Sequence, residues 1–353
     1  MPLLQWLLLD CMPISPKTFQ RLLLTWFDQH GRKDLPWQQN KSPYSVWISE
    51  IMLQQTQVAT VIPYFHAFMK RFPTCAALAR ATEDEVLHHW AGLGYYSRAR
   101  CLHRAAKMIM TAFNGIFPNQ FDDLIKLPGI GASTANAILS IAFGKQAAIM
   151  DGNVKRVFAR LFAIESPINV KQTEQQLWAI AERYMPAARA ADYTQAIMDL
   201  GATHCVRRHP PCQQCALSKH CLAYKQDKVA SLPMKKASRP LPVRAATFLI
   251  YKRGDKVLLL KRPSRGIWGG LWSFPERPPA LHDKARILPS FRHTFTHYHL
   301  DIHPVLINAR RTPDLPVESE YQWYSLAEPV TIGIPKPVQL LLEQLRKEYV
   351  AFR

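Results

Sequence analysis

Residues 127–143 have the sequence LPGIGASTANAILSIAF. Gly129 and Gly131 flank one apolar residue, which is typical of a tight turn, and residues 132–143 continue with the apolar spacing of a helix. The stretch therefore predicts two helices joined by a short hairpin. Backbone N–H groups at the start of the second helix would be free to bind a phosphate group. An ordinary connection between two helices is the alternative, and this motif alone does not separate the two.

A cluster of cysteines follows further along the chain. Four of the seven cysteines have the spacing C-x6-C-x2-C-x5-C, namely Cys205, Cys212, Cys215 and Cys221. Four thiolates so close in sequence can bind one inorganic centre, either a [4Fe–4S] cluster or tetrahedral zinc. A structural zinc site usually has two separated short-spaced pairs, whereas here one C-x2-C pair has an outlying cysteine on each side. The spacing favours iron–sulfur, with zinc as the alternative.

The charge of the chain indicates a polyanionic partner. Lysine and arginine number 45 against 26 aspartates and glutamates, a formal net charge of +19. Such an excess favours nucleic acid, because basic side chains at phosphates release condensed counterions. The odd number of cysteines and their clustering argue against a secreted disulfide scaffold. The apolar start MPLLQWLLL lacks a basic segment and a cleavage site and is too short to cross a bilayer, so we expect a cytoplasmic protein that does not enter a membrane.

The pattern of apolar residues changes along the chain. Residues 16–224 have helical spacing, whereas residues 225–244 are basic and rich in proline, which predicts an extended linker. Residues 1–15 are an N-terminal extension, and residues 245–353 form a second domain. We expect that domain to be α+β, with strands at 246–251, 256–261 and 298–307, a turn at 253–255 and a helix at 337–349.

The hairpin and the cysteine cluster together resemble the helix-hairpin-helix DNA glycosylases of the endonuclease III superfamily. In that superfamily a catalytic aspartate follows the hairpin, and Asp151 occupies its place here. The lyases of the superfamily carry a lysine in the helix after the hairpin, where this chain has Ser133. A hydroxyl cannot form the imine through which a lysine cuts the backbone, so we infer a monofunctional glycosylase.

Three further motifs resemble MutY-type adenine DNA glycosylases: SEIMLQQTQ at 49–57, LGYYSRAR at 93–100 and MDGNVKR at 150–156. The resemblance implies that Glu50 protonates the adenine and that Asp151 stabilises the cationic sugar. It further implies that Asn153 orients a carboxylate and water and that Ser133 completes the pocket. The DNA contacts that it implies are a wedge of Gln55 and Tyr95, residues Thr56 and Leu93 close by, and the hairpin glycines 129 and 131.

The second domain resembles the Nudix-related domain of the same family, through IWGGLWSFP at 267–275 and FRHTFTHYH at 291–299. Phe295, Thr296 and His297 match the loop that recognises 8-oxoguanine, although serine is usual in the place of Thr296. The acidic helix of a Nudix hydrolase is missing after Pro275, so this domain should bind rather than hydrolyse. A metal site is the alternative for residues 293, 297 and 299, because strand alternation would place three histidines on one face.

The resemblance thus implies a mainly α glycosylase domain with a [4Fe–4S] loop, plus a smaller α+β Nudix-like domain. The implied partner is double-stranded DNA with adenine opposite 8-oxoguanine or guanine, and we expect a monomer acting on the bacterial nucleoid. Two alternatives are a bifunctional glycosylase/lyase, which Ser133 and the second domain oppose, and a binder of damaged DNA without activity. The binder would need neither Glu50 nor Asp151.

Overall fold

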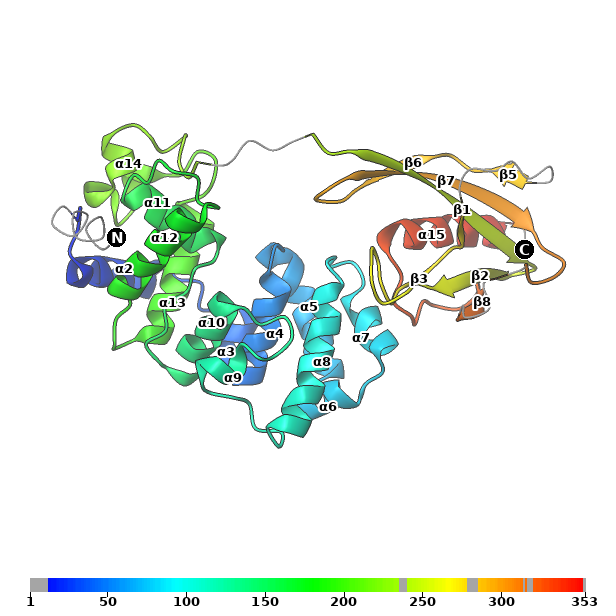
Figure 1. The fold of residues 1–353 in the computed structure, drawn as a ribbon, viewed down its shortest axis with the longest axis horizontal. Coiled ribbons are helices and arrows are strands. Elements are labelled where there is room, and N and C mark those ends of the chain that lie inside the picture. The colour runs from blue at the N-terminus through cyan, green and yellow to red at the C-terminus, as the bar shows by residue number, and fades with distance from the viewer. Residues whose placement is uncertain (1–11, 235–239, 278–284, 314, 316–319, 352–353) are drawn as a thin grey trace. The chain divides into compact units, whose positions relative to one another are not determined.

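The computed structural model describes residues 12–234, 240–277, 285–313, 315 and 320–351 (Figure 1). Its internal contacts divide the chain into two compact units. The helical unit comprises residues 1–69 and 108–237, and the mixed unit comprises residues 70–107 and 238–353. The predicted N-terminal extension lies largely outside the described residues, which begin at Met12.

The helical unit is built from helices and short turns of helix. Its elements are α2 (Pro16–His30), α3 (Pro36–Gln39), α4 (Pro43–Leu53), α9 (Phe121–Leu124), α10 (Ala132–Phe143), α11 (Gly152–Leu161), α12 (Lys171–Tyr184), α13 (Ala190–Asp199), η1 (Leu200–His204), η2 (Cys212–Gln214), η3 (Ser218–His220) and α14 (Leu222–Lys225). Helices α5 (Val58–Arg71) and α8 (Ser97–Ala112) each contribute residues to both units.

Local sequence explains where several of these helices begin. Ser15 and Ser42 each precede a proline, and each side chain accepts a hydrogen bond from a backbone N–H of the helix that follows, α2 and α4 respectively. Serine satisfies an otherwise unpaired N–H at a helix start, and proline fits the first helical position because it has no N–H to lose. Asp151 caps α11 in the same way.

The predicted hairpin is confirmed by α9, the turn after it and α10, which spans residues 132–143. Gly129 has a φ of +81°, a conformation that favours glycine. Gly131 is the N-cap of α10 and, having no side chain, caps no N–H. Both glycines are exposed.

Helix α10 is the central helix of the helical unit. It contacts α4 and α13, and α13 contacts α2. Its residues are apolar on most sides, and seven of its twelve are buried. A helix that is apolar all round belongs inside a core. Its packing brings the end of α4 and the face of α13 toward the loop before α11.

The mixed unit combines short helices with one sheet. Its elements are α6 (Cys75–Arg80), α7 (Glu83–Trp90), β1 (Val243–Arg253), β2 (Lys256–Lys261), β3 (Trp272–Ser273), β4 (Glu276–Arg277), β5 (Ala285–Ile287), β6 (Phe291–Thr294), β7 (His299–Asn308), β8 (Tyr321–Ser325) and α15 (Lys336–Ala351). The strand order is β3-β2-β1-β7-β5, with β4 beside β1, β6 beside β7 and β8 beside β2.

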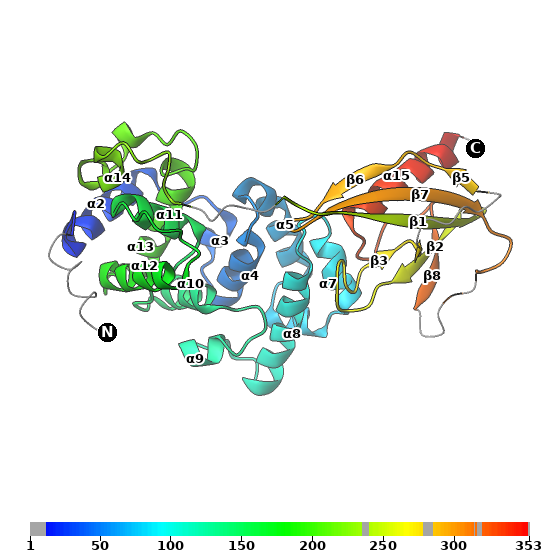
Figure 2. The same ribbon diagram turned by 45° about the horizontal axis from the view of Figure 1, so that its top comes forward.

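The predicted strands of the second domain are confirmed with small shifts at their ends. β1 and β2 pair antiparallel across Gly254, whose φ is +60°. β7 pairs in parallel with β1 over its length, as Figure 2 shows. The closing helix is α15, which buries one apolar side with Val338, Leu342 and Leu345. The helical first domain and the α+β second domain are therefore the fold class that the sequence predicts.

The structure argues against the alternative of a metal site at residues 293, 297 and 299. That alternative depended on strand alternation placing His293, His297 and His299 on one face. Instead β6 ends at residue 294, β7 begins at residue 299, and the residues between them turn the chain. The period-two alternation that would align the three rings is therefore interrupted. Within the described residues no group of three or more histidine, cysteine, aspartate or glutamate side chains could hold a metal ion.

No helix among the described residues is both long and apolar enough to cross a membrane.

Candidate active site

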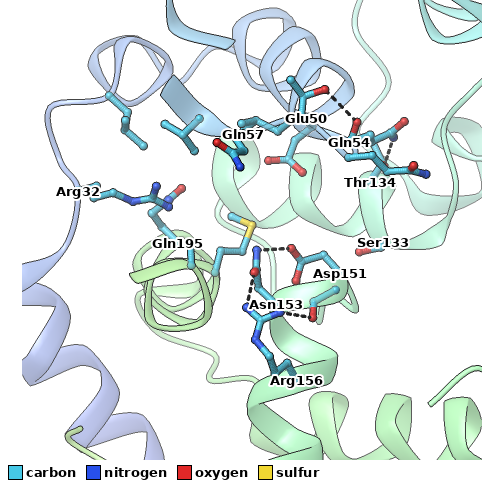
Figure 3. A pocket seen from close by; sticks show the side chains of 18 of the residues that line it. Arg32, Glu50, Gln54, Gln57, Ser133, Thr134, Asp151, Asn153, Arg156 and Gln195 are labelled. Carbon is cyan, nitrogen blue, oxygen red and sulfur yellow. Dashed lines mark hydrogen bonds between the residues drawn. The ribbon is translucent and has the colours of Figure 1, made fainter. Parts of the chain in front are cut away.

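The helical unit contains a pocket of about 860 Å³, within the size range of small-molecule sites (Figure 3). Its walls come from the end of α4, the turn that follows, the start of α10, the loop before α11, and α13. Several residues predicted from sequence line it together: Glu50, Gln55, Thr56, Ser133, Asp151 and Asn153. Residues far apart in the chain thus converge on one cavity.

Glu50 is an acid held in its protonated form. It lies in α4 between the buried residues Ser49 and Ile51, is itself half-buried, and lines the pocket. Burial raises the pKa of its carboxyl to about 8, with a smaller contribution from the charge of Asp151. Loss of water disfavours the anion, and a nearby carboxylate disfavours it further. Glu50 can therefore donate a proton near neutral pH.

Asp151 is placed to carry a negative charge. Burial raises the pKa of its carboxyl, and the hydrogen bonds that it accepts oppose that rise. Its Oδ1 accepts from the backbone N–H of Val154 at 2.8 Å, and its Oδ2 accepts from Asn153 Nδ2 at 3.0 Å. As the N-cap of α11 it also lies at the positive end of the helix dipole. When Glu50 and Asp151 share one proton, the contacts to Asp151 stabilise its ionised form, so the proton resides on Glu50.

Asn153 is held from both sides. Its Nδ2 donates to Asp151, while its Oδ1 accepts from Arg156 Nη2 at 2.8 Å. Arg156 also donates to the backbone carbonyls of Gly201 and Cys205 in the chain after α13. A Cβ at Gly201 would lie 2.6 Å from that of Asn153, so only glycine allows this close approach. The carboxylate of Asp151 is thus oriented by a side chain that cannot itself turn freely.

Ser133 holds the segment before Asp151. Its Oγ accepts a hydrogen bond from the backbone N–H of Met150 at 3.0 Å. This bond joins the start of α10 to the loop before Asp151. Ser133 and Met150 are 17 residues apart in sequence.

The remaining residues predicted to contact DNA are distributed over both units. Gln55 lines the pocket with a φ of +59°, and Thr56 follows it. In the mixed unit Leu93 is buried, whereas Tyr95 is 41% exposed with a φ of +48°. The hairpin glycines are exposed and do not line the pocket.

The 295–297 loop connects β6 and β7 in the mixed unit. The Phe295 ring packs 5.2 Å from that of Trp268, and Thr296 and His297 are exposed beside it. These residues and Tyr95 line a second pocket of about 530 Å³. The loop therefore has an aromatic base, formed by Phe295 and Trp268, and presents a hydroxyl and an imidazole to solvent.

The four clustered cysteines are half-buried and form no disulfide. Burial, with a smaller contribution from the other three thiols, raises the pKa of the Cys215 thiol to about 11, so the four groups are neighbours. Their sulfurs do not form a metal-holding group in the part of the chain that the structure describes. The donor set itself, four unpaired thiols in one loop, fits a soft metal centre such as an iron–sulfur cluster.

Arg32, Gln54 and Gln195 also line the active-site pocket, and the sequence reasoning did not single them out. Gln54 donates from Nε2 to Thr134 Oγ1 at 3.3 Å. Arg32 and Gln195 both bond to the buried carboxylate of Asp199. A signal existed in AADYTQAIMDL, where a glutamine and an aspartate stand four residues apart among apolar residues.

Comparisons with known proteins agree with this architecture. Residues 48–183 match the family model "HhH-GPD superfamily base excision DNA repair protein", and residues 246–344 match the NUDIX domain. The fold of the helical part is similar to that of a thermostable thymine-DNA glycosylase, with a TM-score of 0.54 and 28% identity over 60% of this chain and 97% of that one. A non-covalent complex of endonuclease III with DNA, 23% identical, has the same fold, with a TM-score of 0.50 over 61% of this chain and 98% of that one.

The hairpin, the pair of carboxyls at one pocket and the family model define a base-excision DNA glycosylase of the helix-hairpin-helix superfamily. Curated adenine DNA glycosylases are similar to this chain. The one from Buchnera aphidicola subsp. Acyrthosiphon pisum (strain APS) is 41% identical over 93% of this chain and 98% of its own. The one from Homo sapiens is 35% identical over 73% of this chain and 57% of its own. The chain belongs to the adenine DNA glycosylase family.

Proposed function

We propose that this enzyme removes adenine mispaired with 8-oxoguanine or guanine in double-stranded DNA and leaves the abasic strand uncut. The observation that carries the proposal is the pairing of Glu50, protonated near neutral pH, with Asp151 at one pocket. Acid-assisted loss of a base from a sugar needs one proton donor and one anion.

Glu50 acts first in the proposed reaction. Adenine leaves poorly as an anion, so Glu50 delivers its proton to N7 of the base as the glycosidic bond breaks. The Glu50 carboxylate that results then accepts a proton from the water that attacks the sugar. A pKa of about 8 keeps the acid loaded at neutral pH.

Asp151 stabilises the other product of bond cleavage. The sugar becomes an oxocarbenium-like cation, and the carboxylate, oriented by Asn153 and by the helix that it caps, supplies the opposite charge. Because the contacts of Asp151 with Asn153 and with α11 exist before the base leaves, the carboxylate needs little reorganisation during the reaction. Ser133 keeps the loop in register through Met150.

The base reaches this pocket only when it is turned out of the helical stack. Gln55, with Thr56 next to it, lies at the pocket and is proposed to fill the space that the base leaves. Exposed Tyr95, with the buried Leu93 two residues before it, is proposed as a second wedge. The N–H groups that follow Gly129 and Gly131 are proposed to bind a phosphate.

The mixed unit is proposed to recognise the base opposite the adenine. Phe295, Thr296 and His297 present a hydroxyl and an imidazole over an aromatic base, which suits contact with the edge of 8-oxoguanine. Glu276, the acidic residue that directly follows Pro275, pairs with Arg262. This supports binding rather than hydrolysis for the Nudix-like domain, for which we propose bounds of 245–353, after a 16–224 catalytic domain and a 225–244 linker.

Cys205, Cys212, Cys215 and Cys221 are proposed to hold a [4Fe–4S] cluster, which would tie their loop together when bound. Iron and acid-labile sulfide in the purified protein would support this, and zinc alone would contradict it. Arg207, Arg208 and Lys219 in the same loop would carry positive charge to the DNA backbone. A monomer acting on the nucleoid in the cytoplasm completes the proposal.

Ser133 supports a monofunctional enzyme over a lyase. The nearby amine, Lys155, has its Nζ 2.6 Å from Glu174, so it is engaged elsewhere. A DNA binder without activity would have no use for an acid whose pKa is raised to about 8 beside a second carboxyl.

The deciding experiment measures free adenine in single turnovers on duplexes that differ only in the base opposite the adenine. We expect release opposite 8-oxoguanine and guanine, none opposite thymine, and an uncut strand until alkali is added. Strand scission in step with base release would favour the lyase instead. Binding without any release would favour the non-catalytic binder.

A further inference from the structure

The division into two compact units separates residues 70–107 from the rest of the predicted catalytic domain. Helix α7 and the start of α8 belong to the same unit as the sheet. Tyr95, proposed above as a wedge, and the proposed recognition loop 295–297 are therefore parts of one unit, and both line its pocket of about 530 Å³. The contacts between α7–α8 and the sheet fix where one lies relative to the other.

An ion pair joins α7 to strand β2. Lys261 Nζ in β2 lies 3.0 Å from Asp84 Oδ2 in the first turn of α7, and the two side chains are only 24% and 28% exposed. Asp84 Oδ1 is also buried and has no hydrogen-bond partner among the described residues. The other carboxylate near Lys261 is that of Glu320, at 3.4 Å and 62% exposed. Water screens the pair with Asp84 less, so reversing one of its charges places two like charges in a partly buried contact.

Close packing at the segment before α15 completes the contact. A Cβ at Gly333 would lie 2.6 Å from the Cβ of Leu87 in α7, so only glycine allows this approach. The carbonyl of Gly333 accepts from the backbone N–H of Trp272 at 2.9 Å, which ties the segment to β3. Next to it, the carbonyl of Ile334 accepts from Tyr96 Oη at 3.4 Å.

Tyr96 connects this contact to the neighbouring Tyr95. Tyr96 is 8% exposed, whereas Tyr95 is 41% exposed and has a φ of +48°. A residue other than glycine keeps such a conformation only where its surroundings hold it. The Tyr96 hydroxyl also accepts from the backbone N–H of Gly92 at 3.3 Å, so it closes the turn that carries Tyr95. A shift of the sheet side at Ile334 is therefore passed to that turn.

We propose that this docking surface couples recognition of the opposite base to the wedge, with Asp84 and Lys261 as positioning residues. The proposal rests on the function proposed above. While the docking surface is closed, a contact of loop 295–297 with 8-oxoguanine holds Tyr95 where it favours extrusion of the adenine. Opposite guanine the loop lacks that contact, so release there does not depend on the docking surface. The docking surface comprises Asp84, Leu87 and Tyr96 on the helical side and Lys261, Gly333 and Ile334 on the sheet side.

The test compares single-turnover release of adenine opposite 8-oxoguanine and opposite guanine, in duplexes that are otherwise identical. The readout is the ratio of the two rates, because a lesion that only reduces the folded fraction lowers both rates alike and leaves the ratio unchanged. Lys261→Glu sets two carboxylates against each other at the docking surface. We expect the preference for 8-oxoguanine to fall by about fivefold or more.

Asp84→Lys combined with Lys261→Glu restores an ion pair with the signs exchanged, and this double variant should recover most of the preference. It also separates the ion pair from a contact of Lys261 with DNA, because it still lacks the Lys261 amine. The matched control is Glu348→Lys, which reverses one partner of the pair of Arg286 with Glu348, 3.1 Å apart in the same unit. Neither residue lines the second pocket, so the control ratio should equal that of the wild type.

Gly333→Ala opens the docking surface without changing any charge. The added Cβ would lie 2.6 Å from the Cβ of Leu87, so α7 and the segment before α15 must move apart. The same ratio should fall by about fivefold or more, the effect of overpacking one methyl group.

The outcomes separate the docking surface from the function on which it rests. Failure of the wild type to release adenine would overturn the proposed function, and equal wild-type rates on the two duplexes would overturn the proposed reading of the opposite base. With both intact, an unchanged ratio in Lys261→Glu or in Gly333→Ala would overturn the coupling. A ratio that Lys261→Glu lowers and the double variant does not recover would overturn the role of the ion pair.

Discussion

Ser133 accepts a hydrogen bond from the backbone N–H of Met150 at 3.0 Å. The serine that replaces a nucleophilic lysine thus has a positioning contact of its own, one residue before Asp151. Its hydroxyl fixes the loop from which the carboxylate projects, and it does so from the first turn of α10.

Ser133→Ala removes the acceptor and leaves the Met150 N–H without its partner. We expect the single-turnover rate of base release to fall by about five- to tenfold, the equivalent of about 1 kcal/mol for one hydrogen bond. DNA binding should change little. Ser133→Thr keeps the hydroxyl and is the matched control. A rate in Ser133→Ala equal to that of the wild type would show that the bond does not position Asp151.

Glu50→Gln removes the proton donor but keeps the shape of the side chain. We expect base release to be abolished while binding to an adenine:8-oxoguanine duplex, measured by titration, is retained. Undiminished adenine release from this variant would eliminate Glu50 as the acid.

The same variant should alter stability with a defined sign. The folded-state pKa of Glu50, about 8, lies above its ordinary value of 4.5. Its contribution to stability is therefore complete below about pH 4.5 and is lost as the pH rises through 8. Since glutamine does not ionise, Glu50→Gln should melt at a higher temperature than the wild type at pH 8, and the difference should shrink toward pH 5. A lower melting temperature at pH 8 would mean that the site does not disfavour the anion.

Asp151→Asn separates charge from capping. Asparagine is as good an N-cap as aspartate, so its Oδ1 can still accept from Val154. Its NH2 group cannot accept from Asn153 Nδ2, so the stability should fall by about 1 kcal/mol, the effect of one lost hydrogen bond. The cationic sugar, however, loses its counter-charge, and we expect base release to fall by at least about 10²-fold. Denaturant unfolding measured beside the rate distinguishes the two effects. Near-normal turnover in a folded variant would contradict the electrostatic role.

Thr296→Val tests the proposed recognition loop. It replaces an exposed hydroxyl by a methyl group of the same size. The preference for adenine opposite 8-oxoguanine over adenine opposite guanine should fall by about fivefold, the effect of one lost hydrogen bond. Thr296→Ser keeps the hydroxyl and should retain the preference. Equal losses on both duplexes would argue against a role in reading the opposite base.

The sequence predicted those features that depend on local pattern. The two glycines before an apolar helix predicted the hairpin and α10, and alternation with a glycine turn predicted β1 and β2. Glu50 was identifiable because a charge in an apolar helix is costly and so has a purpose. In each case the determining residues are neighbours in the chain.

The features that were missed depend on contacts between distant segments. Arg32 and Asp199 are 167 residues apart, and nothing local shows that one carboxylate serves both Arg32 and Gln195. The alternative of a metal site at residues 293, 297 and 299 depended on alternation along one strand. The residues there alternate as a strand would, but the pairing of β6 with β7 requires a turn between them. Pairing of strands, rather than side-chain alternation, decides where a strand ends.

The most direct test of the two-carboxyl site is the pH dependence of single-turnover adenine release by the wild type. With Glu50 as the acid, the rate should be level near neutral pH and then fall tenfold per pH unit above a midpoint of about 8, where Glu50 loses its proton. On the acid side it should fall where Asp151 becomes protonated, above the ordinary carboxyl pKa of 3.8. A rate that stays level or rises from pH 7 to well above 8 would contradict a protonated Glu50 as the group that releases the base.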